Sequence, residues 1–470
     1  MRGIPRIAVE RNLPVAGSDQ SAKDIYSNNN LCAWLHDMYT VDASKTGAQD
    51  YYNSLFNLYA SWGVDFVKVD DLSSPYHADE TEMIRKAIDN CGRHIVLSTS
   101  PGETPVKYAS HIQQHANMWR IVGDFWDNWP QLKEHFEVCN RWAPYISFGA
   151  WPDADMLPLG HIGIRAERGN DRMSQLTNDE QYTLMTLFAI FRSPLMFGGD
   201  LPTSDSFTIS LLTNRNVLSV NKSSINNRQL LKNNDIVVWS ADDPSNGDKY
   251  LAFFNIADQQ MIVKEKAIWT SGVISRDTPG QSIDIDIDIT GTDKLYLAVT
   301  DGGDNIDWDH ADWITPVIYN NHDTIKLTSL NWIKAMAGWG EVQINKSVSG
   351  GKLILNNKEF TEGIGTHSNS IIEYDIPAGY NHFKASAGLD HACMIQQAGA
   401  TVEFMVFKQN PAGPLPPDSE KITLKLNQLD MEGEFLVENL WTGEKQGVCK
   451  DEITVGVRRH ASVLYKLRKQ

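Results

Sequence analysis

The sequence has few cysteines for its length, five among 470 residues. They are scattered along the chain without a CxxC pair, at Cys32, Cys91, Cys139, Cys393 and Cys449. This spacing excludes a small scaffold held together by disulfides, and the odd number leaves at least one thiol free. The 13 histidines show no HExxH spacing and no zinc-site pattern, and we expect no cofactor.

Long apolar runs and an excess of basic residues are also missing. No run reaches the roughly 18 residues that a membrane-spanning helix needs. The chain has 42 Lys and Arg against 59 Asp and Glu, which gives a net charge of −17. Because clustered Lys and Arg are needed to hold a phosphate backbone, we expect neither a nucleic-acid partner nor a membrane span.

The composition favours a folded protein of several domains. Hydrophobic residues make up 41% of the chain, enough for a large core. The length predicts about two to four domains. The 14 Trp fit carbohydrate handling, because sugar rings stack their apolar C–H faces on indoles, although ordinary core packing explains most of them equally well.

The first 210 residues alternate short apolar strands with amphipathic helical segments. Strands buried on both faces and separated by helices are typical of a parallel α/β sheet. We expect five strands, at 64–71, 93–100, 118–125, 145–157 and 193–200. A closed (β/α)8 barrel has eight strands. Residues 1–210 are therefore either a smaller α/β fold or, as we favour, the last five-eighths of a TIM barrel whose first strands are missing from an amino-terminally shortened chain.

From about residue 215 the pattern changes to an all-β one. Short strands are separated by Gly, Asn, Asp and Pro turns, as in antiparallel sheets. The segment SIDIDIDI (282–289) alternates strictly, so its Asp side chains should face water and its Ile side chains a core.

Two carboxylates that end strands form the candidate catalytic pair. Asp70 ends the strand VDFVKVDD, and Asp124 ends MWRIVGD on what we expect to be a neighbouring strand. Glycoside hydrolysis needs one carboxylate to attack or activate water and another to protonate the leaving oxygen. Lys68 shares a strand face with Asp70 and should keep it ionised, while Arg120 is placed to hold a substrate hydroxyl. Alternatively, such Asp residues only cap the following helices.

Three segments resemble glycoside hydrolase family 27, the retaining α-galactosidases. They are GVDFVKVDD (63–71), WRIVGDFWDNW (119–129) and GAWPDADMLPLG (149–160). The last departs from the family motif, with Pro152 in place of Asn and Ala154 in place of Pro. The resemblance implies that Asp70 is the nucleophile, with Lys68 beside it, and that Asp124 is the acid/base. It also implies that Arg120 binds the sugar and that Asp155 and Met156 lie on the pocket wall.

The resemblance leaves the substrate open. It implies a retaining exo-glycosidase that removes terminal α-D-galactose from oligo- or polysaccharides. Ser100, in the loop after the second expected strand, resembles relatives that admit an N-acetyl group, which favours α-N-acetylgalactosaminides. β-L-Arabinopyranosides would fit the same mechanism. The family's Met-Gly-Trp-Asn-Ser-Trp and Asp-Asp motifs, which line the sugar subsite, are absent here, so a non-catalytic carbohydrate-binding fragment is the other alternative.

A second resemblance lies in the carboxy-terminal half. Residues 338–340, 347–348 and 363–367 resemble the signatures of NPCBM carbohydrate-binding β-sandwich modules, and 295–313 resembles the end of that module. We therefore expect a permuted module over 266–410. It would be inserted into an antiparallel β-sandwich domain of the glycosidase, formed by the two segments 211–265 and 418–470.

Two further expectations concern metal and location. Asp301, Asp304, Asp307 and Asp309 form a cluster that could bind Ca²⁺, although we favour a solvated Asp-rich turn. The first residues, MRGIPRIAVERNLPVAG, lack the pattern of a signal peptide. The resemblance to family 27 implies a parent protein that is secreted or periplasmic.

Overall fold

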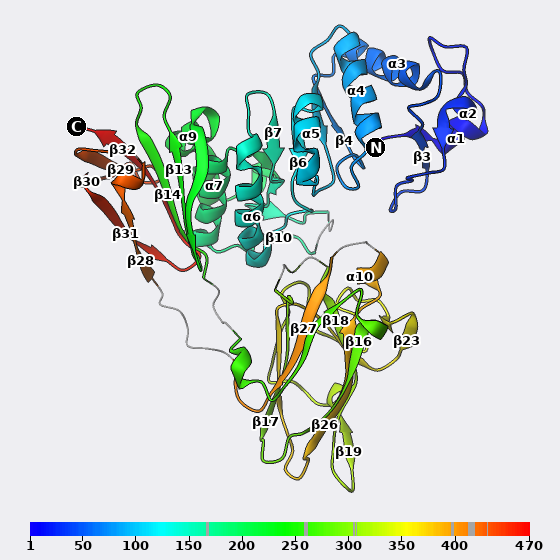
Figure 1. The fold of residues 1–470 in the computed structure, drawn as a ribbon, viewed down its shortest axis with the longest axis vertical. Coiled ribbons are helices and arrows are strands. Elements are labelled where there is room, and N and C mark those ends of the chain that lie inside the picture. The colour runs from blue at the N-terminus through cyan, green and yellow to red at the C-terminus, as the bar shows by residue number, and fades with distance from the viewer. Residues whose placement is uncertain are drawn as a thin grey trace. The chain divides into compact units, whose positions relative to one another are not determined.

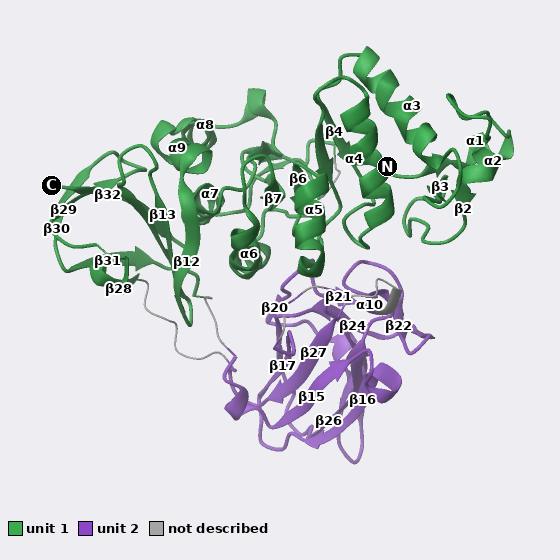
Figure 2. Ribbon diagram, turned by 45° about the horizontal axis from the view of Figure 1, so that its top comes forward, with its two compact units in different colours: residues 1–257, 417–470 green, residues 258–416 purple. Residues whose placement is uncertain are grey.

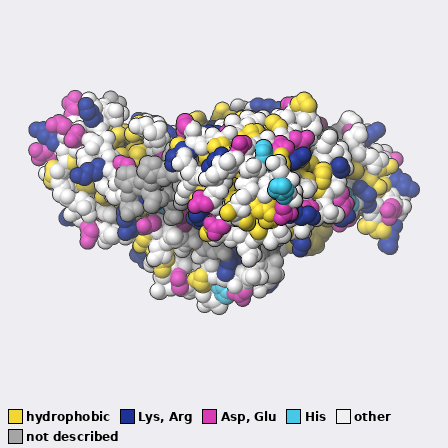
Figure 3. All heavy atoms as spheres, turned by 90° about the horizontal axis from the view of Figure 1, so that it is seen from below, with side chains coloured by type: hydrophobic (Ala, Val, Ile, Leu, Met, Phe, Trp, Pro, Cys, Tyr) yellow, Lys and Arg dark blue, Asp and Glu magenta, His cyan; other side chains and the backbone are white. Residues whose placement is uncertain are grey.

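The computed structural model describes residues 1–165, 169–257, 262–303, 306, 308–395, 399–411, 419–429 and 431–470. The chain forms two compact units, drawn in different colours in Figure 2. The first combines residues 1–257 with 417–470, and the second comprises 258–416. Among the described helices, none is long and apolar enough to cross a membrane. On the face drawn in Figure 3, acidic and basic side chains are interspersed.

A parallel four-stranded sheet organises the first half of the first unit (Figure 1). Its strands follow one another in chain order: β4 (Phe66–Val69), β5 (Val96–Thr99), β6 (Met118–Arg120) and β7 (Trp151–Asp153). The intervening helices are α3 (Ala48–Ser61) before β4, α4 (Ala78–Asn90), α5 (Ala109–His115) and α6 (Trp129–Trp142). This order, with a helix between successive strands, is that of βαβ units.

Local sequence explains where the longest helices begin. In α6, the Asn128 side chain accepts a hydrogen bond from the Gln131 backbone, and Pro130 lies in the first turn, where its missing N–H costs nothing. In α7 (Asn178–Phe191), Thr177 and Glu180 form a capping box. Helix α7 is apolar on nearly every face and accordingly lies in the core.

The α/β part differs from the expected sheet in three respects. Strand β4 is not buried on both faces, since Phe66 is 41% exposed at the edge of the sheet. The fifth expected strand, β11 (Met196–Phe197), pairs in parallel with β8 (Met156–Leu157) in a separate two-stranded sheet. Before the first expected strand, the chain forms α1 (Arg6–Glu10), α2 (Ala22–Ile25) and a small antiparallel sheet of β1 (Ile4–Pro5), β3 (Met38–Val41) and β2 (Tyr26–Ser27).

The remainder of the first unit is an antiparallel β region. Its six-stranded sheet has the order β12 (Ile225–Asn233), β13 (Ile236–Asp242), β14 (Lys249–Asn255), β32 (Ser462–Lys469), β29 (Phe435–Asn439) and β30 (Lys445–Cys449). Strands β28 (Ser419–Lys425) and β31 (Glu452–Arg458) form a second sheet that shares one hydrophobic core with the first. Helices α8 (Ser206–Thr213) and α9 (Arg215–Ser223), and strands β9 (His161–Ile162) and β10 (Arg172–Met173), precede this region.

The second unit contains two antiparallel sheets around one core. One has the order β15 (Trp269–Ser275), β27 (Thr401–Phe407), β17 (Lys294–Thr300), β25 (Ser370–Asp375) and β20 (Lys334–Met336). The other has the order β16 (Ser282–Asp288), β26 (His382–Leu389), β18 (His310–Tyr319), β24 (Gly363–His367) and β21 (Gln343–Ile344), with β19 (Thr324–Lys326) paired to β18. A hairpin of β22 (Leu353–Leu355) and β23 (Lys358–Phe360), and α10 (Ala392–Ile395), complete the unit. The alternation expected for 282–289 is confirmed, because Asp284 and Asp286 are exposed and Ile285 is buried.

Candidate active site

Asp70 lies directly after β4, at the carboxyl end of the parallel sheet, and is half-buried. Its Oδ1 accepts a hydrogen bond from the Ser100 hydroxyl at 2.9 Å. Ser100 follows β5 and is itself buried. This hydrogen bond holds the Asp70 carboxylate in one orientation.

The loop that carries Ser100 is held against the end of the next strand. Thr104 donates from both its backbone N–H and its hydroxyl to the carbonyl of Arg120, at 3.1 and 2.8 Å. Gly102 lies so close to Val122 that an added Cβ would be 1.2 Å from the Val122 carbonyl oxygen. Only glycine permits this approach, which places Ser100 beside Asp70.

Asp124 is the most accessible carboxylate of the site, with a side chain that is 73% exposed. Arg120, in the last position of β6, donates to its Oδ1 at 3.0 Å and to the Gly123 carbonyl at 2.6 Å. The Arg120 side chain is only 4% exposed. Asp124 is thus held on one side by a buried guanidinium and open to a bound substrate on the other.

The guanidinium of Arg120 also reaches Asp155. Its Nη1 lies 2.8 Å from Asp155 Oδ1, while Asp155 Oδ2 accepts from the Phe125 backbone at 2.8 Å. We expected Arg120 to hold a sugar hydroxyl and Asp155 to line the pocket. Within the described residues, the contacts of both side chains are to one another and to the loop that carries Asp124, so they can orient Asp124. Their roles toward the sugar stay predictions.

The arrangement of strands corrects one sequence-based expectation. Asp70 and Asp124 do not follow neighbouring strands, because β5 pairs with β4 on one side and β6 on the other. Two strand spacings separate β4 and β6 by about 10 Å at the backbone. The side chains of Asp70 and Asp124 can extend toward one another across much of this distance. Ser100, which follows β5, lies between the two strands.

The two remaining predicted residues lie on different sheets, Lys68 on β4 of the four-stranded sheet and Met156 on β8 of the two-stranded one. Lys68 is exposed on β4, two residues before Asp70, and its charge opposes the rise in the pKa of Asp153. Met156 begins β8 and packs against Gly198, where an added Cβ would be 2.5 Å from its sulfur. Their roles in substrate binding stay predictions.

Asp153 lies in the segment 149–160 that resembles family 27, but no role was predicted for it from the sequence. It ends β7, is 1% exposed, and accepts a hydrogen bond from the Asp155 backbone at 3.0 Å. Burial raises its pKa to about 6, against the opposing effect of the Arg120 charge. Asp153 pairs with Arg120 across β6 and β7, and the sequence alone did not show which residues of these two strands lie opposite each other.

Replacing Asp153 with Asn should alter the pH dependence of stability. The pKa of Asp153 is higher in the folded protein than in the unfolded chain, where it is about 3.9. Asp153 therefore stabilises the fold fully below about pH 3.9, and this contribution is lost as the pH rises through about 6. Asn keeps the acceptor and never ionises. Relative to wild type, we expect Asp153→Asn to gain up to about 3 kcal/mol in unfolding free energy between pH 4 and 7. Urea unfolding at each pH measures this; a constant difference would contradict it. Asp19→Asn, at an exposed carboxyl, is the control.

The Asp cluster proposed for Ca²⁺ is only partly described, because Asp304 and Asp307 lie outside the described residues. Asp309 is fully buried, with Oδ1 accepting from the Thr401 backbone at 3.1 Å and Oδ2 from the Ser368 hydroxyl at 2.6 Å. Asp301 accepts from the Gly303 backbone at 3.0 Å. Asp309 is therefore not part of a solvated turn, and Ca²⁺ binding stays untested.

Comparisons with known proteins bear on this site. The family model described as Alpha galactosidase A matches residues 13–223, and that of the NPCBM/NEW2 domain matches 242–319 and 323–413. The solved structure of a family 27 β-L-arabinopyranosidase from Geobacillus stearothermophilus is 32% identical, with a TM-score of 0.64, covering 99% of this chain and 72% of that protein. The chain belongs to glycoside hydrolase family 27. Both expected resemblances are confirmed.

Other similar proteins are described as acting on other sugars. A putative α-N-acetylgalactosaminidase from Bacillus halodurans is 29% identical, with a TM-score of 0.60, covering 100% of this chain and 74% of that one. Alpha-galactosidase 2 of Arabidopsis thaliana is 31% identical over 212 residues, 43% of this chain and 50% of the relative. This family 27 chain thus spans about half the length of the curated relatives it matches.

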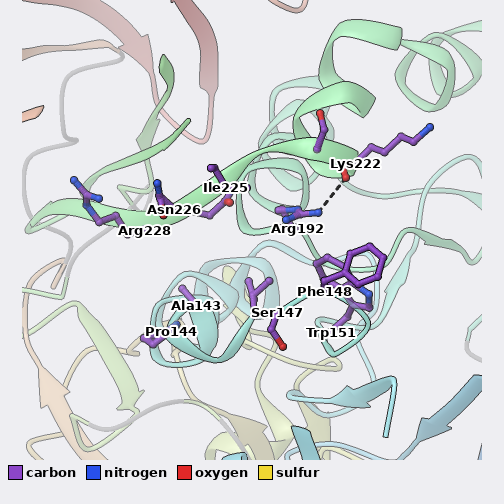
Figure 4. A pocket seen from close by; sticks show the side chains of 13 residues that line it. Ala143, Pro144, Ser147, Phe148, Trp151, Arg192, Lys222, Ile225, Asn226 and Arg228 are labelled. Carbon is purple, nitrogen blue, oxygen red and sulfur yellow. Dashed lines mark hydrogen bonds between the residues drawn. The ribbon is translucent and has the colours of Figure 1, made fainter. Parts of the chain in front are cut away.

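A separate hollow of about 630 Å³ lies at the opposite end of the family 27 sheet (Figure 4). Trp151, which begins β7, and Arg192 contribute to its wall, with the guanidinium 4.6 Å from the indole centre. Arg192 also donates to the carbonyl of Lys222, the dashed line in Figure 4. The amino ends of barrel strands serve stability rather than catalysis. Asp70 and Asp124 lie beyond the opposite, carboxyl ends of β4 and β6.

Proposed function

We propose that the protein is a retaining exo-glycosidase that acts on terminal α-D-galactosyl residues. The observation that carries the proposal is the pair of oriented carboxylates at the carboxyl ends of β4 and β6. Asp70 accepts from Ser100, and the exposed Asp124 is held by the buried Arg120. Family membership supports the same assignment.

The proposed reaction has two displacements. In the first, an Asp70 oxygen bonds to the anomeric carbon while the glycosidic C–O bond breaks, and protonated Asp124 gives its proton to the departing oxygen. In the second, the Asp124 carboxylate takes a proton from water, whose oxygen attacks the anomeric carbon and releases Asp70. Arg120 and Asp155 keep the Asp124 carboxylate aimed at that oxygen.

The hydroxyl of Ser100 bears on sugar preference. It donates to Asp70, so it supports positioning of the nucleophile more directly than contact with an N-acetyl group. β-L-Arabinopyranose has the ring configuration of α-D-galactopyranose without the C6 hydroxymethyl group. An arabinopyranoside is therefore a natural alternative substrate for the same pair of carboxylates.

We further propose that β4 to β7, with β8 and β11, are part of a (β/α)8 barrel, and that the second unit is a carbohydrate-binding module inserted into the antiparallel β region. The parallel strands β4 to β7, which follow in chain order and are each preceded by a helix, support the first statement, as does the parallel pairing of β11 with β8. The second rests on the match to the NPCBM/NEW2 domain and on the position of 258–416 between the two segments of the first unit.

The proposal is tested with three nitrophenyl glycosides: α-D-galactopyranoside, N-acetyl-α-D-galactosaminide and β-L-arabinopyranoside. We expect release of nitrophenol from the galactoside. NMR of the reaction should show that the galactose released first has the same anomeric configuration as the substrate. Inversion of configuration would contradict double displacement. No hydrolysis of any of the three by the purified chain would favour a binding function without catalysis.

An aromatic cluster in the second unit supports that second candidate function. Trp308 is 41% exposed, and its ring centre lies 5.8 Å from that of His310, which lies 5.3 Å from Trp339. The Trp308 carbonyl accepts hydrogen bonds from the His310 backbone and the Cys393 thiol, which hold the backbone that carries the indole. An exposed, anchored indole is suited to stacking on the apolar face of a sugar.

Replacing Trp308 with Ala should weaken binding of a galactose polysaccharide by about 10-fold, or 1.4 kcal/mol. Affinity electrophoresis of the whole chain in gels containing galactomannan measures the change. Trp62→Ala removes an indole that is 67% exposed in the first unit and serves as the control. Equal retardation of the Trp308 variant and wild type would remove Trp308 from the binding surface.

A further inference from the structure

Three side chains on adjacent helices bring ligand atoms together away from the carboxylate pair. Glu82 lies on α4, and His111 and His115 lie one turn apart on α5. One ligand atom from each lies within 4.8 Å of the other two. Within the described part of the chain, no other group of three His, Cys, Asp or Glu side chains meets this condition. We propose that Glu82, His111 and His115 bind Zn²⁺ or a divalent ion of similar ligand preference.

The spacing on α5 aligns the two imidazoles. Residues four apart lie on the same helical face, and the ring centres of His111 and His115 are 4.2 Å apart with 21° between the ring planes. The Nε2 of His111 lies 2.8 Å from Glu82 Oε1. Ligand atoms around tetrahedral zinc are about 3.3 Å apart, given Zn–N distances of about 2.0 Å. Small side-chain rotations therefore suffice to bring all three onto one ion.

Hydrogen bonds to the other ring nitrogens leave Nε2 as the ligand atom. His115 Nδ1 lies 2.7 Å from the His111 carbonyl oxygen, which can only accept, so Nδ1 carries the proton and Nε2 has the free lone pair. His111 Nδ1 lies 2.6 Å from the Tyr76 hydroxyl, to which it can donate once Nε2 binds metal. Zinc-bound histidines usually have such a partner, which fixes ring orientation.

The surroundings keep this arrangement accessible yet ordered. The side chain of His111 is 27% exposed and that of Glu82 is 55% exposed, so an ion can enter from solvent. Tyr76 packs on Tyr108 with ring centres 4.6 Å apart, which holds the phenol that contacts His111. Two imidazoles and a carboxylate suit Zn²⁺ and leave a fourth position for water. Bound metal would join α4 to α5.

Zinc titration of the whole chain, freed of metal by a chelator, tests the proposal by calorimetry. We expect one tight site in wild type and at least about 100-fold weaker binding in His115→Asn, whose amide can still donate to the His111 carbonyl. Tyr76→Phe should weaken binding by about 10-fold. His322→Asn, at an exposed turn histidine, should leave the site intact.

Cobalt provides an independent measurement. Co²⁺ in place of Zn²⁺ should give the intense visible absorption of four-coordinate cobalt, and Glu82→Gln should lower its intensity or affinity. An unchanged tight site in His115→Asn, or loss of that site in His322→Asn, would overturn the assignment. Circular dichroism of each metal-free variant identifies any that fail to fold, and Glu82→Gln, the most conservative change, then decides.

Discussion

Asp70→Asn should lower kcat for α-D-galactoside hydrolysis by at least about 10⁴-fold, because loss of a catalytic nucleophile removes the covalent route entirely. Asn has nearly the shape of Asp and can still accept the Ser100 hydroxyl through its amide oxygen. The variant should therefore fold and bind sugar with little change in KM. Initial rates on the nitrophenyl galactoside, measured over a range of concentrations, separate the two parameters.

Asp65→Asn is the matched control. Asp65 immediately precedes β4, and its exposed carboxylate pairs with Arg93. It lies at the amino end of the same strand, so its loss should leave kcat within about twofold, as expected of an exposed ion pair. Azide should restore turnover to an Asp70→Ala variant by attacking the anomeric carbon. Full activity in Asp70→Asn would remove Asp70 from the nucleophile role.

Local patterns predicted the elements that depend only on neighbouring residues. The alternation in 282–289 places Ile285 in the core because side chains on a strand point to opposite faces, whatever pairs with it. The polar end of β4 was recognisable for a similar reason, because an apolar run precedes Asp70. The end of β6 was not, since β6 stops at Arg120 and Asp124 lies in the loop that follows. The pairing order was not, and it is β5 that separates Asp70 from Asp124.

The supporting contacts of the site required the three-dimensional structure. Ser100 and Asp70 are 30 residues apart, and Arg120 and Asp155 are 35 apart, so no helical or strand period relates them. The contact of Arg120 with Asp155 was not visible in the sequence, and the predicted role of Arg120 as a sugar ligand stays a prediction. The short strands β1 and β2, with two residues each, carry no periodicity at all.

Arg2 makes buried contacts with two carboxylates that are distant in the sequence. It is 3% exposed, and its guanidinium lies 2.9 Å from Asp71 Oδ2 and 2.6 Å from Glu80 Oε2. Tyr52 donates to the other Glu80 oxygen at 2.6 Å. Burial raises the pKa of Asp71 to about 6, and that of Glu80 is also raised, in both cases against the opposing charge of Arg2.

Arg2→Ala should lower the unfolding free energy by about 3–5 kcal/mol at pH 8, because it leaves two buried carboxylates without their cation. Urea unfolding measures the loss. The loss should shrink as the pH falls below 6, since protonated carboxyls no longer need the partner. Arg141→Ala removes an exposed pair with Glu103 and should cost less than about 1 kcal/mol at either pH. A loss that is the same at pH 5 and pH 8 would contradict this account.

The same variant links stability to catalysis. The Arg2 backbone N–H donates to the Asp70 carbonyl at 3.0 Å, and Arg2 Nε donates to the Asp71 carbonyl at 2.7 Å, so this segment holds the chain on which the proposed nucleophile lies. Asp71 has a φ of 64°, a backbone conformation that needs such support. Below the unfolding transition, Arg2→Ala should therefore lower kcat for the galactoside as well as stability. Arg141→Ala, which leaves Asp70 and Asp71 untouched, should not.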